Sequence, residues 1–348
     1  MKKIIPALAA CLVISSVAHG APVYSTEDMS LDVIGRAKVN FYNNEANSER
    51  RMTGTARLGV DGKTRVMDNL KVYGYLLYDL AAQETKQTSD RLKIRYGYVG
   101  FDMNLAGRIS FGRFENAFYK TTAPTDLFTD WGDGGVSYWK LTANDYGGRM
   151  DGQALYDFNL NGWFLALSYN FKDTSKYLEK GYSGTVGYEF ENVSGQPLGF
   201  MVGINHLFGL KDDRRGYGAD GWFYGADKKE YAVSVYYGSF GAPGFYAAAV
   251  YNHGELEKTY KGDGGEIAFS YTTPESLFTF TGTYGYIKNQ DRSLTRYQSS
   301  RLSTTWTGNI TWKLTSNFNI YSEFEHRLDN AWKDEKDTLL TLGLIYNF

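Results

Sequence analysis

Residue types that perform most enzyme chemistry are sparse in this chain, and their spacing matches no catalytic pattern. Three of the four histidines follow position 20, at His206, His253 and His326. No G-x-S-x-G motif marks a nucleophile. Asp126, Asp130 and Asp133 lie close together, but they lack the spacing of a calcium-binding loop. We therefore predict no catalytic residues, no metal site and no cofactor, so the acidic cluster needs another role.

These aspartates belong to the longest polar segment of the chain, residues 114–146, which is also rich in large apolar side chains. The large apolar and aromatic side chains of this segment are Phe114, Phe118, Tyr119, Leu127, Phe128, Trp131, Tyr138 and Trp139. Loops of this length are uncommon and are usually functional. Folding inward against a surrounding wall would let the aromatic rings pack while the carboxylates face water. The composition of the segment therefore predicts a loop that folds into the interior of a hollow structure. A loop in that position would narrow any channel through the interior.

In the rest of the chain, apolar and polar residues alternate. An alternation with a period of two residues predicts β-strands that have one apolar face and one polar face. In the first such segment the apolar residues are Leu31, Val33, Ala37, Val39 and Phe41, and the polar ones are Asp32, Arg36, Lys38 and Asn40. The alternation recurs after Trp163, from Tyr182 and near Phe278. Strands of about ten residues with one apolar side are typical of transmembrane β-barrels with a polar interior.

The chain ends on a strand of this kind. Apolar residues occupy every second position up to the last one: Leu340, Leu342, Leu344, Tyr346 and Phe348. A barrel without a lipid-exposed edge needs its last strand to pair with its first. We therefore expect the last strand to pair with residues 31–41, and we assign Tyr346 and Phe348 to barrel closure and to the assembly signal.

Two kinds of connection alternate along the chain. Seven short turns lie at residues 67–70, 102–107, 159–162, 192–197, 241–244, 273–276 and 314–317. Eight longer polar loops lie near residues 43–51, 82–90, 114–146, 172–180, 211–228, 253–263, 289–300 and 329–336. Together they join sixteen strands and put both termini on the side of the short turns. A barrel of this size is too wide for side chains to fill, so the count predicts an aqueous channel.

The N-terminus predicts export. Residues 1–20 have the pattern of a cleaved signal peptide, with Lys2 and Lys3 before an apolar stretch, which leaves residues 21–348 as one barrel domain. The alternative is a lipid-modified Cys11, the only cysteine of the chain.

Composition agrees with a barrel. Aromatic residues make up 16% of the chain, with 29 tyrosines and 39 glycines, which fits aromatic girdles around a barrel. A net charge of −2 argues against a strongly basic nucleic-acid binder. A large soluble all-β protein is the structural alternative. The signal peptide, the terminal Phe348 and the lack of a blade repeat argue against it.

In its motifs the chain resembles the general, non-specific diffusion porins of Gram-negative outer membranes, of the trimeric enterobacterial type. The motifs are LDVIGRA, TARLG, SFGR before the long loop and the terminal Tyr-x-Phe, in this order over essentially the whole mature chain. The resemblance implies an all-β fold: a 16-stranded antiparallel transmembrane β-barrel with its long third loop folded into the lumen. It implies passive diffusion of ions and small hydrophilic solutes across the outer membrane. The implied partners are two further copies in a homotrimer, outer-membrane lipid and lipopolysaccharide, periplasmic chaperones and the barrel-assembly machinery.

In that family a basic cluster on the wall faces acidic residues on the inward-folded loop. Carried over by motif, the basic wall would be Arg36, Arg57, Arg113 and Arg149, and the acidic partners would be Asp126 and Asp130. Such opposing charges set up a field that orders water and aligns polar solutes. Strict alternation places Arg113 with Ile109 and Phe111 on the lipid side. Its position in the pore therefore requires a bulge at Gly112 or an early end of the strand.

The chain departs from the family pattern around the second acid. Asp130 stands where a glutamate is usual, Thr129 replaces a proline and Trp131 replaces a phenylalanine. A shorter acid and a missing proline would alter the reach of the loop. A further basic row consists of Arg91, Lys93 and Arg95, which would extend the cationic wall or lie near the outer rim.

Two other functions stay open. Trp131, Trp139 and Trp222 would suit a porin specific for oligosaccharides, although loop packing or interface anchoring explains the same tryptophans. A barrel enzyme, such as a phospholipase or protease, is less favoured. Aspartates in an open water channel lack the dry environment that raises a carboxyl pKa toward neutrality.

Overall fold

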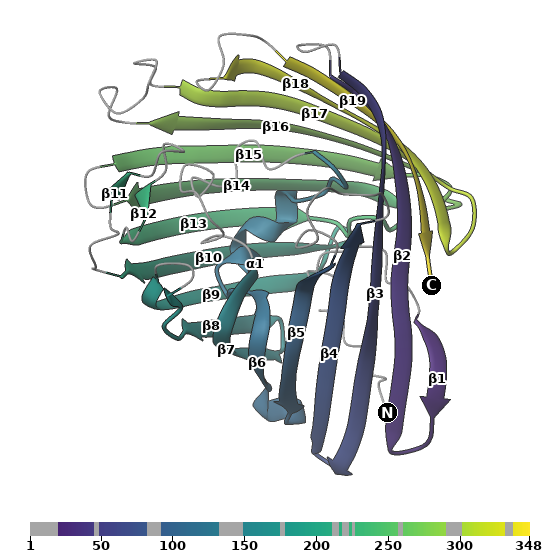
Figure 1. Cartoon of the computed structure of the whole chain (residues 1–348), viewed down its shortest axis with the longest axis vertical. Helices are drawn as coiled ribbons and strands as arrows, with labels where there is room; N and C mark the ends of the chain where they lie inside the picture. The colour runs from purple at the N-terminus through teal and green to yellow at the C-terminus, as the bar shows by residue number, and fades with distance from the viewer. Residues whose placement is uncertain are drawn as a thin grey trace.

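The computed structural model describes residues 20–44, 49–81, 92–131, 149–174, 178–210, 216–217, 223–224, 227–256, 260–289, 301–330 and 337–348. In these ranges the chain is mainly antiparallel β-strand, and Figure 1 shows one sheet curving into a wall. The wall strands are β2 (Met29–Asn44), β3 (Glu49–Met67), β4 (Leu70–Ala81), β5 (Leu92–Asp102), β6 (Arg108–Glu115), β7 (Arg149–Leu160), β8 (Trp163–Asn170), β9 (Leu178–Val193), β10 (Gln196–Gly209), β13 (Lys228–Tyr237), β14 (Gly244–Leu256), β15 (Tyr260–Thr272), β16 (Phe278–Asn289), β17 (Arg301–Lys313), β18 (Phe318–Asn330) and β19 (Asp337–Asn347).

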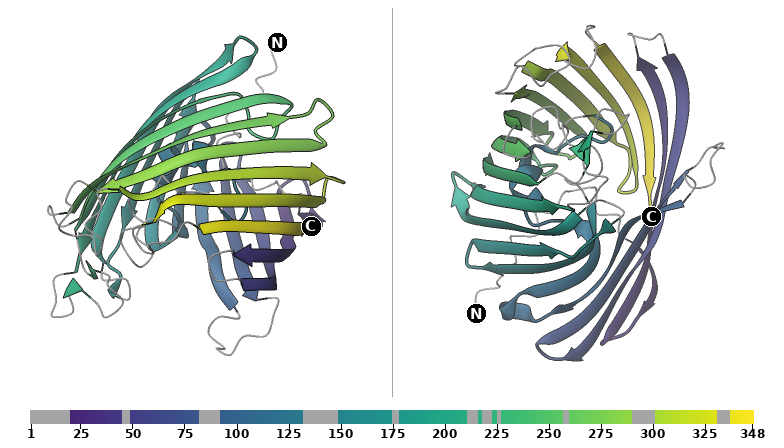
Figure 2. Two further views of the ribbon diagram at one scale, coloured as in Figure 1. Left: turned by 90° about the horizontal axis from the view of Figure 1, so that it is seen from above. Right: turned by 60° about the vertical axis from the view of Figure 1, so that its left-hand side comes forward.

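The wall closes on itself, which confirms the predicted 16-stranded barrel. Each of these strands pairs with its neighbour along the chain, and β19 returns to pair with β2, from Leu339 opposite Asn44 to Asn347 opposite Arg36. Figure 2 shows the tilted strands from two further directions. The expected pairing of the last strand with the first is thus confirmed.

A short additional strand continues the line of β19 along β2. Strand β1 (Ala21–Ser25) pairs with β2 between Ser30 and Val33. Just beyond the end of β19, Phe348 exchanges backbone hydrogen bonds with Gly35 at 2.7 and 3.0 Å. The C-terminus and β1 therefore lie end to end along β2 (Figure 1). Two further short strands, β11 (Gly216–Tyr217) and β12 (Phe223–Tyr224), pair only with each other.

All seven predicted short turns join neighbouring wall strands, but some loops at the other end are shorter than expected. The predicted loop 253–263 is the clearest error, because β14 and β15 leave only residues 257–259 between them. Polar pairs across the two strands explain the extension: His253 Nδ1 lies 2.9 Å from Asp263 Oδ1, and Lys261 Nζ lies 2.6 Å from Glu255 Oε1. Cross-strand pairs stabilise a ladder whether the side chains are polar or apolar.

Burial follows the predicted alternation. In β19 the apolar Leu340, Leu342 and Leu344 are exposed, whereas Thr341 and Asn347 are buried. Large apolar side chains on the outside and polar ones on the inside are what a wall in lipid requires. Among the described residues, no helix is long and apolar enough to cross a membrane.

An apolar patch interrupts the polar inner face. Its buried members are Phe164, Met201, Tyr236, Tyr246, Ala248 and Ala268. Leu127 of the long loop packs against this patch, and the short helices α1 (Tyr119–Thr122) and η4 (Ala123–Thr125) lie nearby. Burial of apolar surface therefore favours a loop that lies against the wall.

Candidate functional site

The first half of the long loop is fastened to strands β8, β9 and β14. The Ala117 N–H donates to Ser168 Oγ at 3.1 Å, and Thr185 Oγ1 donates to the Ala117 carbonyl at 2.7 Å. The Tyr246 hydroxyl donates to the Pro124 carbonyl at 2.7 Å. Wall side chains thus bond to the backbone just before α1 and within η4, and so hold both short helices against the wall.

A glycine on β10 makes room for the helix. A Cβ atom at Gly203 would lie 2.2 Å from Thr121 Oγ1 and 3.1 Å from the Phe118 ring. Contacts this short force something to move, so α1 reaches the wall only because position 203 has no side chain.

Replacing Gly203 with valine is therefore expected to displace α1 from the wall without opening the barrel. Limited digestion of the purified variant should show faster trypsin cleavage after Lys120 than in the parent protein. Gly282→Val is the matched control, because the nearest atom to an added Cβ there is 3.8 Å away. Equal cleavage rates in the two variants would refute the role of Gly203.

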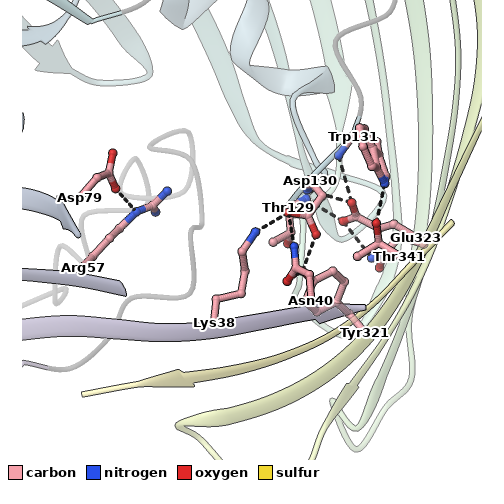
Figure 3. Close-up of polar contacts among 11 residues, drawn as sticks. Lys38, Asn40, Arg57, Asp79, Thr129, Asp130, Trp131, Tyr321, Glu323 and Thr341 are labelled. Atoms are coloured by element: carbon pink, nitrogen blue, oxygen red, sulfur yellow. Dashed lines mark hydrogen bonds and ion pairs between the residues drawn. The ribbon is translucent and has the colours of Figure 1, made fainter. Parts of the chain in front are cut away.

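The last described residues of the loop are fastened to another part of the wall through Asp130. Its carboxylate accepts hydrogen bonds from Lys38 Nζ, from Asn40 Nδ2 at 2.9 Å and from the Tyr321 hydroxyl, and it forms an ion pair with Lys38 (Figure 3). The side chain of Asp130 is only 12% exposed and that of Lys38 only 8%. Asp130 is thus bound to the wall by a lysine that the motifs did not single out.

Glu323 on β18 holds the backbone of the same turn. Its carboxylate accepts the N–H groups of Thr129, Asp130 and Trp131 at 2.6, 2.8 and 3.1 Å. Asn309 Nδ2 adds a fourth hydrogen bond at 3.2 Å. Glu323 therefore holds the loop turn through three consecutive backbone N–H groups, and sequence reasoning missed it.

Trp131 completes this attachment. Its indole Nε1 donates to Thr341 Oγ1 at 2.8 Å, and its ring centroid lies 5.4 Å from that of Tyr42. These contacts favour the anchoring interpretation of Trp131. Trp139 and Trp222 lie outside the described residues.

Three arginines gather elsewhere on the wall, around Asp79 of β4. Arg57 Nε lies 2.8 Å from Asp79 Oδ1, and Arg95 Nη1 lies 3.2 Å from Asp79 Oδ2. Arg36 is directly opposite Arg57 in the β2–β3 ladder. The structure therefore brings together two of the predicted arginines with Arg95, which the sequence left between wall and rim. Asp79 was missed because its role depends on the β3–β4 register, which places it opposite Arg57.

The two remaining predicted arginines have other partners. Arg149 Nη1 lies 3.3 Å from Glu115 Oε1, which also accepts a hydrogen bond from the Tyr96 hydroxyl. Arg113 pairs with Asp151 at 3.0 Å and donates to the Ile94 carbonyl at 3.0 Å.

The β6–β7 register shifts between Gly112 and Phe114, and Gly112 has φ +140°. The irregularity that the sequence allowed at Gly112 is thus present. It leaves Arg113 with partners different from those of Arg57.

The other predicted acid, Asp126, accepts a hydrogen bond from the Tyr119 hydroxyl at 2.6 Å. Burial, with the Asp126 charge as a second cause, holds the pKa of Tyr119 well above its usual value. The phenol therefore stays protonated at neutral pH and remains a donor to Asp126. Both predicted loop acids are thus engaged within the loop or with the wall.

The described histidines contact residues outside this arrangement of charges. Each of the three histidines has a partner: His206 with Tyr182 at 2.9 Å, His253 with Asp263 at 2.9 Å and His326 with Thr338 at 3.0 Å. In the described part of the chain, no group of three or more histidine, cysteine or acidic residues is placed to hold a metal ion. The arrangement consists of fixed charges beside residues 116–131 of the loop, a segment that is fastened to the wall at both of its ends.

Comparison with known proteins agrees with this geometry. Residues 7–348 match the Gram-negative porin family. Outer membrane porin PhoE of Salmonella typhimurium is 25% identical over 362 residues, with all of both chains covered. OmpF of Salmonella typhi, in complex with daunomycin, is similar in structure with a TM-score of 0.79 at 18% identity, covering 94% of this chain and 100% of that one. The trimer form of OmpT of Vibrio cholerae gives a TM-score of 0.69 at 16% identity, covering 92% and 100%.

Proposed function

This chain belongs to the Gram-negative porin family, whose members form diffusion pores in the outer membrane, and on that premise we propose that its fastened loop forms a charged constriction in the pore. Ions and small hydrophilic solutes pass through it passively. We assign the constriction to the loop around Asp126 and Asp130, and to the arginines on the wall, of which Arg36 and Arg57 lie closest to one another in the ladder.

The observation that carries this proposal is the attachment of one short segment to distant strands. Between Asn116 and Trp131 the loop contacts β8, β9 and β14 at one end, and β2, β18 and β19 at the other. A barrel of sixteen strands has an interior that its own side chains cannot fill. A segment that spans this interior reduces the free cross-section, and anchors at both ends keep the reduced opening constant.

The mechanism needs no chemical step. Arginine keeps its charge when clustered, so the Arg57 side of the pore remains cationic over the physiological pH range. Fixed charges beside a narrow opening order the water within it and align polar solutes, whereas an apolar solute has to disrupt that order. The proposed function is therefore that of a passive channel and not that of an enzyme.

Single-channel recording in a planar bilayer tests the function directly. We expect stepwise insertions, each giving a stable current that rises in proportion to voltage. A correctly folded, heat-modifiable preparation that produces no current steps would refute the proposal.

An oligosaccharide-specific channel is the second candidate, and a row of tyrosines favours it. Tyr75 stacks on Tyr98 at 5.3 Å between centroids, and Tyr73 and Tyr96 meet these two rings edge-on at 6.3 and 6.0 Å. Liposome swelling with sugars of graded size separates the two functions. A general pore gives rates that fall smoothly with solute size, and a specific one saturates with one class of sugar.

Several properties of the assembled protein belong to the same proposal. We propose that three copies associate, as in the trimer form of Vibrio cholerae OmpT, in contact with outer-membrane lipid and lipopolysaccharide. Export would use cleavage after Gly20, then periplasmic chaperones and the barrel-assembly machinery; residues 1–19 lie outside the described residues. Mobility of unheated protein in gels and the mass of the mature N-terminus test these points.

A further inference from the structure

The positive and negative charges of the proposed constriction are neutralised to different degrees. Arg57 and Arg95 pair directly with Asp79, whereas Arg36, which lies opposite Arg57, has both Asp130 and Asp79 as neighbouring negative charges. Among the described residues, Asp79 is the only carboxylate that forms ion pairs with Arg57 and Arg95. The arginine cluster, Arg36, Arg57 and Arg95, therefore carries an excess of two positive charges over Asp79.

The acidic side of the constriction is neutralised in place. Lys38 pairs with Asp130, while Asn40 and Tyr321 donate to the same carboxylate. The Asp130 side chain is 12% exposed, compared with 40% for Asp79. A buried carboxylate that is already paired with an ammonium group attracts few cations from the channel.

The neighbouring acids are similarly occupied. Asp61, on the same side of β3 as Arg57, pairs with Lys63 at 2.9 Å. Glu323 is fully buried and is surrounded by the backbone N–H groups of the loop turn. The other loop acid, Asp126, accepts a hydrogen bond from the neutral Tyr119 hydroxyl and offsets one positive charge of the arginine cluster. The arginine cluster still keeps an unbalanced positive charge, and Figure 3 shows Arg57 and Asp79 well apart from the Asp130 contacts.

From this imbalance we infer that the channel is selective for anions, and that the arginine cluster attracts small carboxylate- or phosphate-bearing solutes into the constriction. The inference rests on the proposed function and adds its solute class. A cluster of one sign in a narrow passage with low-dielectric walls raises the local concentration of counter-ions. Lys38 also determines selectivity, because it neutralises the charge of Asp130, which would otherwise attract cations.

Reversal potentials under a KCl gradient in a planar bilayer test the inference. Chloride should permeate several-fold more readily than potassium through the parent protein. The combined variant Arg36→Gln, Arg57→Gln, Arg95→Gln should lose this preference. Arg65→Gln is the matched control, since Arg65 lies on the same strand as Arg57 but pairs with Glu27 and Asp28 near β1, and it should keep the parent value.

Two single variants make the test independent of whether the combined variant folds. Asp79→Asn should raise the preference for chloride, because the cluster loses its only acid. Lys38→Gln should lower it, because Asp130 regains an unbalanced charge.

A parent channel that prefers potassium, or variants that leave the reversal potential unchanged, would overturn the inference while the diffusion pore itself stands. Complete absence of current would instead count against the proposed function.

Discussion

Replacing Glu323 with alanine should release the tip of the long loop and convert a steady channel into one with a larger and noisier current. The carboxylate accepts three consecutive backbone N–H groups between 2.6 and 3.1 Å, in a place where the Glu323 side chain is fully buried. A buried donor left without its acceptor costs about 1 to 3 kcal/mol. The Asp130 and Trp131 contacts remain, but they hold a turn whose own backbone groups are then unsatisfied.

Single-channel recordings measure this effect. We expect a higher mean conductance and frequent transitions between levels, while the unheated protein migrates in gels as the parent does. Glu255→Ala is the matched control, because this acid pairs with Lys261 between β14 and β15 and not with the long loop. Glu323→Gln should give an intermediate result, because an amide offers only one acceptor oxygen. Current traces indistinguishable from the parent would show that the loop is held by other means.

Sequence periodicity was sufficient to predict the wall but not the loop anchor. The wall follows from alternation and turn residues, which are local and repeat sixteen times. The anchor depends on contacts such as that between Thr129 and Glu323, which are 194 residues apart. No local pattern distinguishes Glu323 from another inward-facing acid, since its partners are backbone N–H groups that any residue supplies.

For the arginines, too, the sequence predicted the face of the strand but not the partner of the side chain. Arg36 and Arg57 could be placed by motif and by parity, because alternation assigns each to the polar face. Which acid faces them depends on register, and the ladder puts Asp79 of the neighbouring strand there. Asp130 was predicted to face the arginines across the pore. The structure binds it to Lys38, which the alternation had placed correctly on the polar face of β2 without revealing its partner.

Deleting Phe348 should greatly reduce the yield of assembled barrel while leaving the conductance of the few assembled channels unchanged. The residue makes both backbone hydrogen bonds to Gly35 and thereby fills the gap between β19 and β1 along β2. Its ring lies over Gly35, where an added Cβ would meet it at 2.3 Å. Without the residue, part of β2 has no neighbouring strand.

An unpaired stretch of backbone in the wall is costly, since lipid offers no hydrogen-bonding partners and each unsatisfied group costs several kcal/mol. The same contact can be tested from its other side with Gly35→Leu, which should displace the Phe348 ring and impair assembly in the same way. Gly62→Leu is the control, because the nearest atom to an added Cβ there is 3.7 Å away. Heat-modifiable mobility in gels measures the assembled fraction, and planar bilayers measure conductance. Full assembly without Phe348, or assembled channels with altered conductance, would mean that the C-terminal contact does not act through closure of the wall.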